Sequence, residues 1–329
     1  MPKKLLMTIV ALVTLLISGT TTFAQEKLRL AWAGVSPTNS PIWVIQERKL
    51  LQKQGVHPEI IAISNSPTVL QALLAGEIDA ASVSVTTLTS SRLAGADTVM
   101  VLGVVPTFVD HIVSVASITS VEQLKGKTGG VNRLGTTSDM GLRLALRRLG
   151  IDPEKDAKII PVGGGPERFA ALSKGIVQFT IIAEPFVREA EKLGFRDLLS
   201  IGSLKIPFWW NGILTREAII KAKRPLIMKL VRAMTEAIHF LKTDKEAAKA
   251  IISKNLGISD PEGLERAYRD YSAVFPEVPY PTPEGVKTML DDLAPRNPKA
   301  ATADPKAFVD MSFVRELEAS GFIKQLYRK

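Results

Sequence analysis

The sequence has no cysteine and only three histidines among its 329 residues. The lack of cysteine excludes disulfides, thiol nucleophiles, zinc–thiolate sites and iron–sulfur clusters. Aromatic residues make up 6% of the chain, and no run of lysine and arginine is interleaved with them as in a nucleic-acid-binding surface. The formal net charge of +9 therefore indicates a solvated surface on which cations alternate with acids, as in residues 242–246 (KTDKE). No nucleic-acid partner is expected.

Long hydrophobic runs are also scarce, and the one at the N-terminus has the features of an export signal. Residues 2–4 are basic (PKK), residues 5–17 are apolar apart from threonine, and residues 18–24 are small and polar. This order is typical of a secretory signal cleaved after Ala24. The apolar run is shorter than the roughly 20 residues that a membrane-spanning helix needs. We therefore expect residues 1–24 to be a signal peptide and the mature chain to be soluble and periplasmic.

From residue 27 onwards, short apolar segments alternate with amphipathic segments that end at glycine. Apolar segments with strand character occur at residues 28–32, 58–63, 79–85, 99–105, 128–132, 158–162 and 176–183. This alternation predicts two βαβαβ halves, each a mostly parallel sheet flanked by helices. After about residue 212 the pattern becomes helical, with proline and glycine between the segments. The expected fold class is therefore α/β with a helical C-terminal tail.

Two extended, proline-containing stretches predict the crossings between two lobes. They lie at residues 104–113 and 204–214. Lobe one is then expected at residues 25–107 and 208–329, and lobe two at residues 108–207. Two short crossings are typical of a hinge, because only a few residues have to change conformation when the lobes rotate.

Ligands of parallel α/β sheets bind beyond the carboxyl ends of the strands, so the segments that follow the predicted strands are the candidate site. Nearly all of these segments are small and rich in hydroxyl, amide or bare backbone groups. Helix capping explains any one of them, but together they line one edge with N–H and O–H donors. The candidate ligand-binding residues in these segments are Asn39, Ser40, Asn65, Ser66, Ser84, Thr86, Thr136, Thr137, Ser138 and Glu184.

Aromatic residues near the crossings form a second set of candidates. Trp43 lies one turn into the first predicted helix, Phe108 lies at the first crossing, and Trp210 lies at the second. Successive side chains of an extended segment point in opposite directions, so Trp209 and Trp210 cannot both face the same core. One of them is therefore available to a ligand. The alternative is that this cluster is a packing plug between the lobes.

Catalytic groups are poorly placed for an enzyme. His57 lies at the start of a predicted strand, His239 lies inside a predicted helix, and only His111 lies in a crossing. No dinucleotide, metal or nucleophile motif has the required spacing, so no catalytic residue, metal ligand or cofactor is expected. A secreted serine hydrolase that uses Ser84 or Ser138 with His111 is the rival hypothesis from a different class.

The order of several short motifs resembles the periplasmic substrate-binding proteins of ABC importers, in the branch that holds nitrate, sulfonate, taurine and thiamine-pyrimidine proteins. The motifs are Pro41 with Glu47, Leu50 and Gly55, then GEIDA at 76–80, AGAD at 94–97, LKGK at 124–127 and GTTS at 135–138. The resemblance covers essentially the whole mature chain. The chain departs from the pattern of this branch at Lys49, Leu51 and Gln178, which weakens the transfer of ligand identity more than that of the fold.

The resemblance implies a two-lobed clamp with the type II periplasmic-binding-protein fold. Such a clamp is a monomer and not an enzyme, closes on a small-molecule solute, and delivers that solute to the membrane subunits of an ABC permease. Arg133 is the only arginine in the predicted loops, and a divalent anion favours an arginine fork. We therefore expect a neutral polar or weakly anionic organic solute. A ligand-sensing subunit that docks on a membrane receptor is the second alternative.

Overall fold

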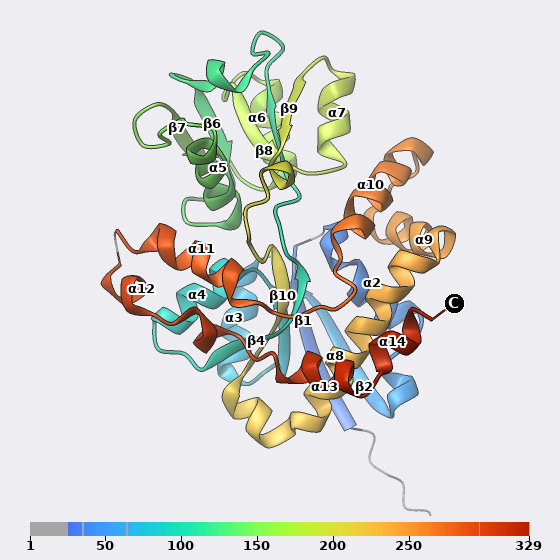
Figure 1. Cartoon of the computed structure of the whole chain (residues 1–329). Helices are drawn as coiled ribbons and strands as arrows, with labels where there is room; N and C mark the ends of the chain where they lie inside the picture. The colour runs from blue at the N-terminus through green and yellow to red at the C-terminus, as the bar shows by residue number, and fades with distance from the viewer. Residues whose placement is uncertain (1–25, 35, 64, 296, 329) are drawn as a thin grey trace, which may run out of the picture.

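Two five-stranded sheets organise the chain, each in its own lobe (Figure 1). The computed structural model describes residues 26–34, 36–63, 65–295 and 297–328. The expected signal peptide, residues 1–24, lies outside the described residues. The two-lobed α/β architecture predicted from the alternation of segments is confirmed.

The sheet of lobe one has the strand order β2-β1-β3-β10-β4. β1 is parallel to β2 and β3, whereas β10 is antiparallel to both of its neighbours. The chain therefore returns from lobe two to insert a strand into a sheet that it has already left. The strands are β1 (Glu26–Ala33), β2 (Val56–Ile63), β3 (Ala80–Val83), β4 (Thr98–Val105) and β10 (Asn211–Arg216), and the helices between them are α2 (Ser40–Glu47), α3 (Ser66–Ala75) and α4 (Val85–Leu93).

The sheet of lobe two repeats this plan with the order β7-β6-β8-β5-β9. β6 is parallel to β7 and β8, and β5 is antiparallel to β8 and β9. Sequence analysis did not identify β9, a short and partly exposed strand with two charged residues. The elements are β5 (His111–Ser114), β6 (Thr128–Val131), β7 (Lys158–Pro161), β8 (Phe179–Ile182) and β9 (Arg196–Ser200), with helices α5 (Thr137–Arg148), α6 (Gly165–Ser173) and α7 (Phe186–Lys192).

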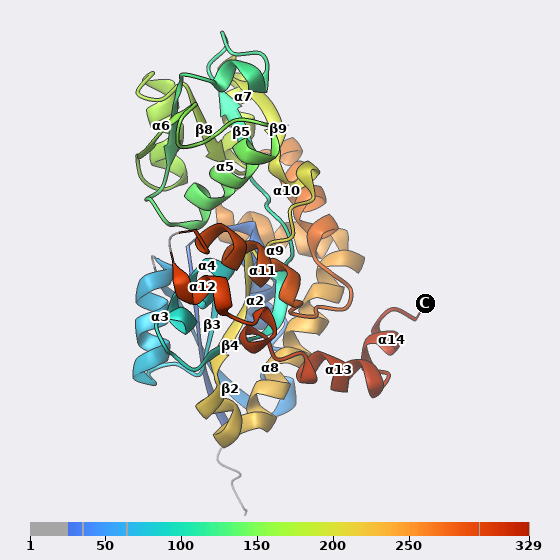
Figure 2. The same cartoon turned by 60° about the vertical axis from the view of Figure 1, so that its left-hand side comes forward.

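The C-terminal region is helical, as predicted, and wraps around lobe one (Figure 2). In both ribbon views α10 rises from this wrapping towards lobe two. No helix in the described ranges is long and apolar enough to cross a membrane. The helices are α8 (Glu217–Thr243), α9 (Lys245–Leu256), α10 (Pro261–Val274), α11 (Pro283–Leu293), α12 (Pro298–Thr302), α13 (Ser312–Ala319) and α14 (Phe322–Leu326).

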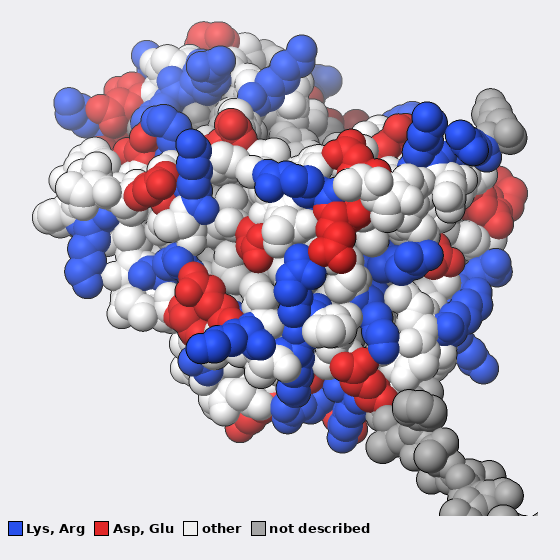
Figure 3. Space-filling model, turned by 60° about the horizontal axis from the view of Figure 1, so that its bottom comes forward, with Lys and Arg blue, Asp and Glu red and all other residues white. Residues whose placement is uncertain are grey.

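Charges of both signs are mixed on the surface of lobe one. Figure 3 shows lysine and arginine interspersed with aspartate and glutamate over the face that looks away from lobe two. Exposed ion pairs of lobe one include Lys229–Glu26 at 2.7 Å and Lys27–Glu59 at 2.5 Å. The pattern agrees with the interpretation of the net positive charge as a solvated surface.

An apolar core runs from lobe one through the crossings into lobe two. Phe108 in the first crossing stacks on Phe208 in the second, with ring centroids 4.1 Å apart and planes inclined by 18°. Both rings belong to one buried cluster that also contains Leu88 of lobe one and Ile181 of lobe two. Because the two crossings are packed on each other, they connect the lobes as one unit.

Trp209 anchors the second crossing to lobe one. Its indole N–H donates to the carbonyl of Thr282 at 2.8 Å. Its ring fills the space where a Cβ atom on Gly103 or Gly285 would lie, at 2.3 Å and 2.7 Å from ring carbons. Glycine is therefore required at both positions, because a side chain there would overlap the ring.

We predict that Gly103→Ala destabilises the protein by about 1–3 kcal/mol, because the methyl group would force Trp209 out of its position. Thermal unfolding monitored by tryptophan fluorescence measures the loss. Gly164→Ala is the matched control, since the nearest atom to its new Cβ is the flexible end of Glu167. Equal melting temperatures for the two variants would contradict the prediction.

Candidate functional site

The N-termini of helices α4 and α5 face each other across the two lobes. Ser84 precedes α4, and its hydroxyl lies 2.5 Å from that of Thr86. The Thr86 hydroxyl in turn lies 3.2 Å from the hydroxyl of Thr137, the first residue of α5. Three predicted site residues therefore form a hydroxyl chain that joins the lobes. Helix N-termini present free backbone N–H groups, so this position suits the negative or polar oxygens of a ligand.

Several other predicted residues use their polar groups within their own loops. The Asn39 amide donates to the carbonyl of Gly34 at 3.0 Å, and the Ser40 hydroxyl donates to that of Pro37 at 2.5 Å. Asn65 caps α3 by accepting from a backbone N–H of the first turn at 3.0 Å. These contacts shape the loops at the ends of β1 and β2.

The loop before α5 is also held together internally. The Thr136 hydroxyl donates to the carbonyl of Arg133 at 2.6 Å. The buried Ser138 hydroxyl accepts from the backbone N–H of Asn132 at 2.9 Å. Of the hydroxyl run in this loop, Thr137 is the one that reaches lobe one. Ser66, the first residue of α3, is half-buried.

The predicted aromatic residues are mainly packing residues. Trp43 is 1% exposed and packs edge-to-face on Trp32 with ring centroids 6.1 Å apart. Phe108 is also 1% exposed and belongs to the stack between the crossings. Trp210 is half-buried and packs edge-to-face on Phe108 at 6.0 Å, whereas Trp209 is buried. Trp210 is therefore the aromatic residue of this set that keeps the most accessible surface.

A group of buried polar atoms near the crossings has no hydrogen-bond partner among the described residues. Buried polar groups in folded proteins are nearly always hydrogen-bonded, so such a group requires an explanation. They include Trp43 Nε1, Thr107 Oγ1, Asp110 Oδ2, Arg168 Nη1 and Asn211 Oδ1.

Asp110 is the acid of this group, and its pKa is shifted by burial. It is 1% exposed, and burial raises its pKa from the ordinary 3.8 to about 6, although the charges of Arg168 and His111 act in the opposite direction. Burial also lowers the pKa of Arg168, against the effect of Asp110. For Tyr271, burial together with the charges of Asp110 and Glu184 raises the pKa well above its usual range. The three side chains therefore lie in one electrostatic environment.

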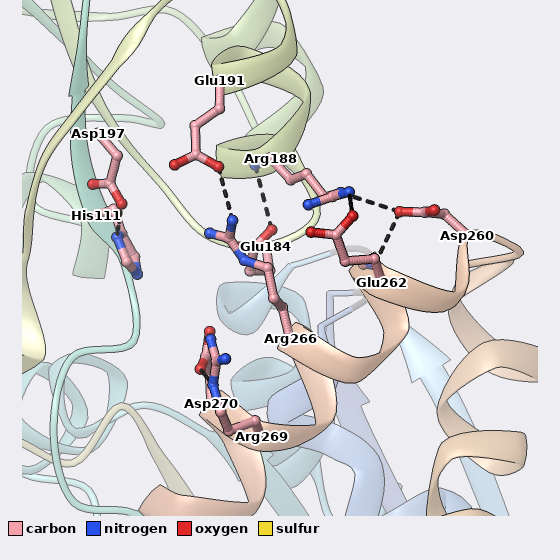
Figure 4. A network of polar contacts seen from close by, with 11 residues as sticks. His111, Glu184, Arg188, Glu191, Asp197, Asp260, Glu262, Arg266, Arg269 and Asp270 are labelled. Atoms are coloured by element: carbon pink, nitrogen blue, oxygen red, sulfur yellow. Dashed lines mark hydrogen bonds and ion pairs between the residues drawn. The ribbon is translucent and has the colours of Figure 1, made fainter.

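Ion pairs between α7 of lobe two and α10 of the C-terminal region hold the lobes together (Figure 4). Arg188 pairs with Asp260 at 3.1 Å and also with Glu262. Arg266 reaches in the opposite direction and pairs with Glu184 and with Glu191, each at 2.8 Å. The predicted site residue Glu184 therefore serves as an anchor for α10.

The buried carboxyl of Glu184 keeps a raised pKa despite this contact. Burial raises the pKa, and the charges of Arg266 and His111 lower it only in part. A further ion pair, between Arg147 of α5 and Asp292 of α11, joins the lobes elsewhere.

His111 makes its hydrogen bond to Asp197, with Nδ1 and Oδ2 2.8 Å apart. Burial lowers the pKa of His111, but the hydrogen bond and charge of Asp197 outweigh this effect and raise the pKa. The hydroxyls of Ser84 and Ser138 are engaged with other groups, as described above. A serine–histidine pair of the kind that a hydrolase needs is thus not formed by these residues. Within the described ranges, no three His, Asp or Glu side chains gather as a metal ion would require.

The sequence model of the NMT1-like family matches residues 23–256. The chain belongs to the NMT1-like family. Among solved structures, this NMT1-like protein is similar to the periplasmic aliphatic sulphonate binding protein SsuA from Escherichia coli, with 22% identity, a TM-score of 0.70, and coverage of 87% of this chain and 92% of that chain. A search of curated proteins found no significant match.

Two further structures with the same fold come from other bacteria. The alkanesulfonate-binding protein SsuA from Xanthomonas axonopodis pv. citri, bound to MOPS, has 18% identity and a TM-score of 0.69 over 87% of this chain and 98% of that chain. The periplasmic nitrate-binding protein NrtA from Synechocystis PCC 6803 has 14% identity and a TM-score of 0.70 over 93% and 92%. The NMT1-like protein therefore has the periplasmic-binding-protein fold, which confirms the resemblance predicted from the sequence motifs.

The sequence did not single out Asp110, Arg168 and Tyr271, whose charges and burial affect one another in the structure. A signal existed for the first, since Asp110 is the one acid in residues 104–113. Arg168 lies in the first turn of α6, directly after a glycine-rich strand end. Tyr271 lies in the C-terminal region, where the helical pattern does not reveal that the charges of Asp110 and Glu184 act on its hydroxyl.

We predict that Asp110→Asn stabilises the protein at pH 8. The folded protein holds the Asp110 proton more tightly than the unfolded chain, so the free energy of unfolding falls as the pH rises from 3.8 to about 6. The neutral amide of asparagine does not lose this stability. A rise of the pKa from 3.8 to about 6 corresponds to about 3 kcal/mol in the free energy of unfolding. Urea unfolding at pH 4 and pH 8 measures the gain, which should vanish at pH 4. A variant that is destabilised at pH 8 would contradict the analysis.

We predict that Arg188→Gln shifts the unliganded protein towards a more open arrangement, by about twofold or more in the ratio of open to closed forms. Because the chain has no cysteine, dyes attached at Lys53→Cys in lobe one and Lys155→Cys in lobe two can report the distance by energy transfer. Lys27→Gln, which breaks a pair inside lobe one, is the control. An unchanged transfer efficiency in Arg188→Gln would show that the α7–α10 pairs do not hold the lobes.

Proposed function

We propose that this NMT1-like protein is an exported solute-binding protein that captures a small polar organic solute between its two lobes. The hydroxyl chain from Ser84 through Thr86 to Thr137 carries the proposal, because it puts helix N-termini of both lobes at one place. A solute bound there contacts both lobes only when they are closed. Binding therefore shifts the equilibrium of the lobes towards the closed form.

The proposal includes delivery of the solute to the membrane subunits of an ABC importer. The solved structures that share this fold are named as binding proteins for sulfonates and nitrate, and the proposal extends their general role to this chain. We also propose that residues 1–24 direct export and that the working form is a monomer. Lobe one then comprises residues 25–107 and 208–329, and lobe two comprises residues 108–207. Residues 104–113 and 204–214 act as the hinge between them. A closed lobe pair then presents one composite surface to the permease.

The alternative of a serine hydrolase has less support. His111 is engaged with Asp197, and the hydroxyls of Ser84 and Ser138 have other partners. A receptor-docking sensor would use the same closure, and the genes adjacent to this one distinguish it from a transport protein. Permease and ATPase genes favour import, whereas a sensor-kinase gene favours signalling.

We predict that Thr137→Val weakens solute binding by about three- to tenfold, since it removes one hydrogen bond to the ligand and the link to Thr86. A thermal-shift screen of sulfonates, carboxylates, nitrate and pyrimidines selects the tightest binder, and calorimetry then measures its affinity for both proteins. Thr302→Val is the matched control, since it makes the same change at an exposed site on α12. Equal affinity in Thr137→Val and the native protein would remove the hydroxyl chain from the site.

A further inference from the structure

Asn211, the first residue of β10, buries an amide oxygen that has no hydrogen-bond partner among the described residues. The residue is 6% exposed, and β10 lies between β3 and β4 in the sheet of lobe one (Figure 1). A buried acceptor without a donor lowers the stability of the folded protein. The position of this oxygen therefore requires an explanation.

The contacts of Asn211 fix the direction in which this oxygen points. Its Nδ2 group donates to the carbonyl of Thr38 at 3.2 Å and to the hydroxyl of Ser82 at 3.4 Å. A backbone carbonyl only accepts, so the nitrogen and not the oxygen of the amide has to face Thr38. The Oδ1 atom is therefore on the arm of the amide that points away from this carbonyl.

The neighbouring side chains are already oriented by their own hydrogen bonds. The Asn39 amide donates to the carbonyl of Gly34 at 3.0 Å, which leaves its oxygen to accept from the Ser82 hydroxyl at 3.4 Å. The single proton of Ser82 is thus used on Asn39, and the Ser82 oxygen accepts from Asn211. This network is buried and uncharged, and it leaves the Asn211 oxygen as an acceptor.

Strand register places Asn211 beside the hydroxyl chain between the lobes. β10 and β3 are antiparallel, with Gly212 opposite Val83. Ser84 follows Val83 with extended backbone angles, so the same register puts Asn211 opposite Ser84. Side chains directly opposite each other lie on one face of a sheet, with Cβ atoms about 4.5–5.5 Å apart. The side chain of Asn211 therefore lies next to the Ser84 end of the hydroxyl chain.

The helix N-termini at the same place offer donors. In the described chain, the N-cap residues Ser84 and Thr136 do not accept with their side chains from the first turns of α4 and α5. Backbone N–H groups of these turns can therefore donate to a ligand oxygen. An anion would satisfy these donors, but its oxygens only accept and would leave the Asn211 oxygen without a donor. A ligand that satisfies both sides needs an acceptor and a donor.

We propose, on the basis of the solute-binding function proposed above, that Asn211 makes the site selective for an uncharged solute with a primary carboxamide group. An N–H of this group donates to Asn211 Oδ1, and its carbonyl oxygen accepts from the N-terminus of α4 and the hydroxyl of Ser84 or Thr86. A carboxamide holds a donor and an acceptor side by side on one carbon atom, which matches two neighbouring residues of adjacent strands. Carboxylates and sulfonates lack the donor at neutral pH.

The experiment compares ligands that differ only in the group offered to Asn211. The probes are acetamide, butanamide and benzamide, each with its N,N-dimethylamide, its methyl ester and its carboxylate. Calorimetry on the mature protein measures each affinity. We expect at least one primary amide to bind about tenfold or more tightly than its three analogues, because each analogue leaves a buried acceptor without a donor.

A variant then assigns this preference to Asn211. Asn211→Ala removes the acceptor, so the amide and its methyl ester should bind within about threefold of each other. The two affinities are compared on one protein, so a general loss of binding does not imitate this result. Asn255→Ala is the matched control and should keep the native ratio, since the Asn255 amide donates to the carbonyl of Ile251 within α9 at 2.8 Å.

The outcomes separate this inference from the proposed function. If an ester or a carboxylate binds as tightly as its amide, or if no amide binds, the carboxamide selectivity is wrong. This comparison is made on the native protein, so it decides the matter even if Asn211→Ala fails to fold. The effect of Thr137→Val on a binder from the wider screen still tests capture between the lobes.

Two mixed outcomes are equally decisive. If the preference for the amide is the same in Asn211→Ala as in the native protein, the role of Asn211 is wrong. If an amide binds through Asn211 but leaves the energy transfer between the lobes unchanged, the carboxamide subsite stands and the closing clamp is wrong.

Discussion

The return of the chain into the first sheet is the constraint on which the structure depends. β10 lies between β3 and β4 and is antiparallel to both, with Ile213 opposite Ser82 on one side and Leu102 on the other. The sheet of lobe one is complete only after lobe two has been made. Lobe two is therefore attached by two segments rather than one, and the carboxyl ends of the parallel strands of both sheets face the space between them. Every contact of the candidate site follows from this placement.

The polar groups at the interface fall into two sets with different physical roles. The ion pairs of Arg188 and Arg266 are partly exposed, so water and salt weaken them and they can break without a large cost. Asp110 is buried, as is the Nη1 atom of the half-buried Arg168, and the low dielectric of their surroundings makes their unfilled hydrogen-bonding capacity expensive. The two sets therefore differ in what it costs to break or to keep them: the first is cheap to break, and the second lowers the stability of the folded protein.

The sequence was informative where local chemistry determines structure, and less so where distant segments meet. The strand ends, the helix starts and the hydroxyl run before α5 follow from local patterns of polarity and glycine. These patterns predict Thr86 and Thr137 as neighbours of the space between the lobes, and their hydroxyls lie 3.2 Å apart. Local patterns do not distinguish the two roles open to Asn39 and Ser40, since a loop-shaping hydrogen bond and a ligand contact use the same residue types. Tyr271 was missed because its position depends on how α10 packs, and no local pattern reports that.

The stack of Phe108 on Phe208 has a mechanical consequence. Two crossings that did not touch each other could change conformation independently. Because the two rings are buried against each other, neither crossing can shift without disturbing the packing of the other. A rotation of one lobe relative to the other would therefore have to move both crossings together or break the stack.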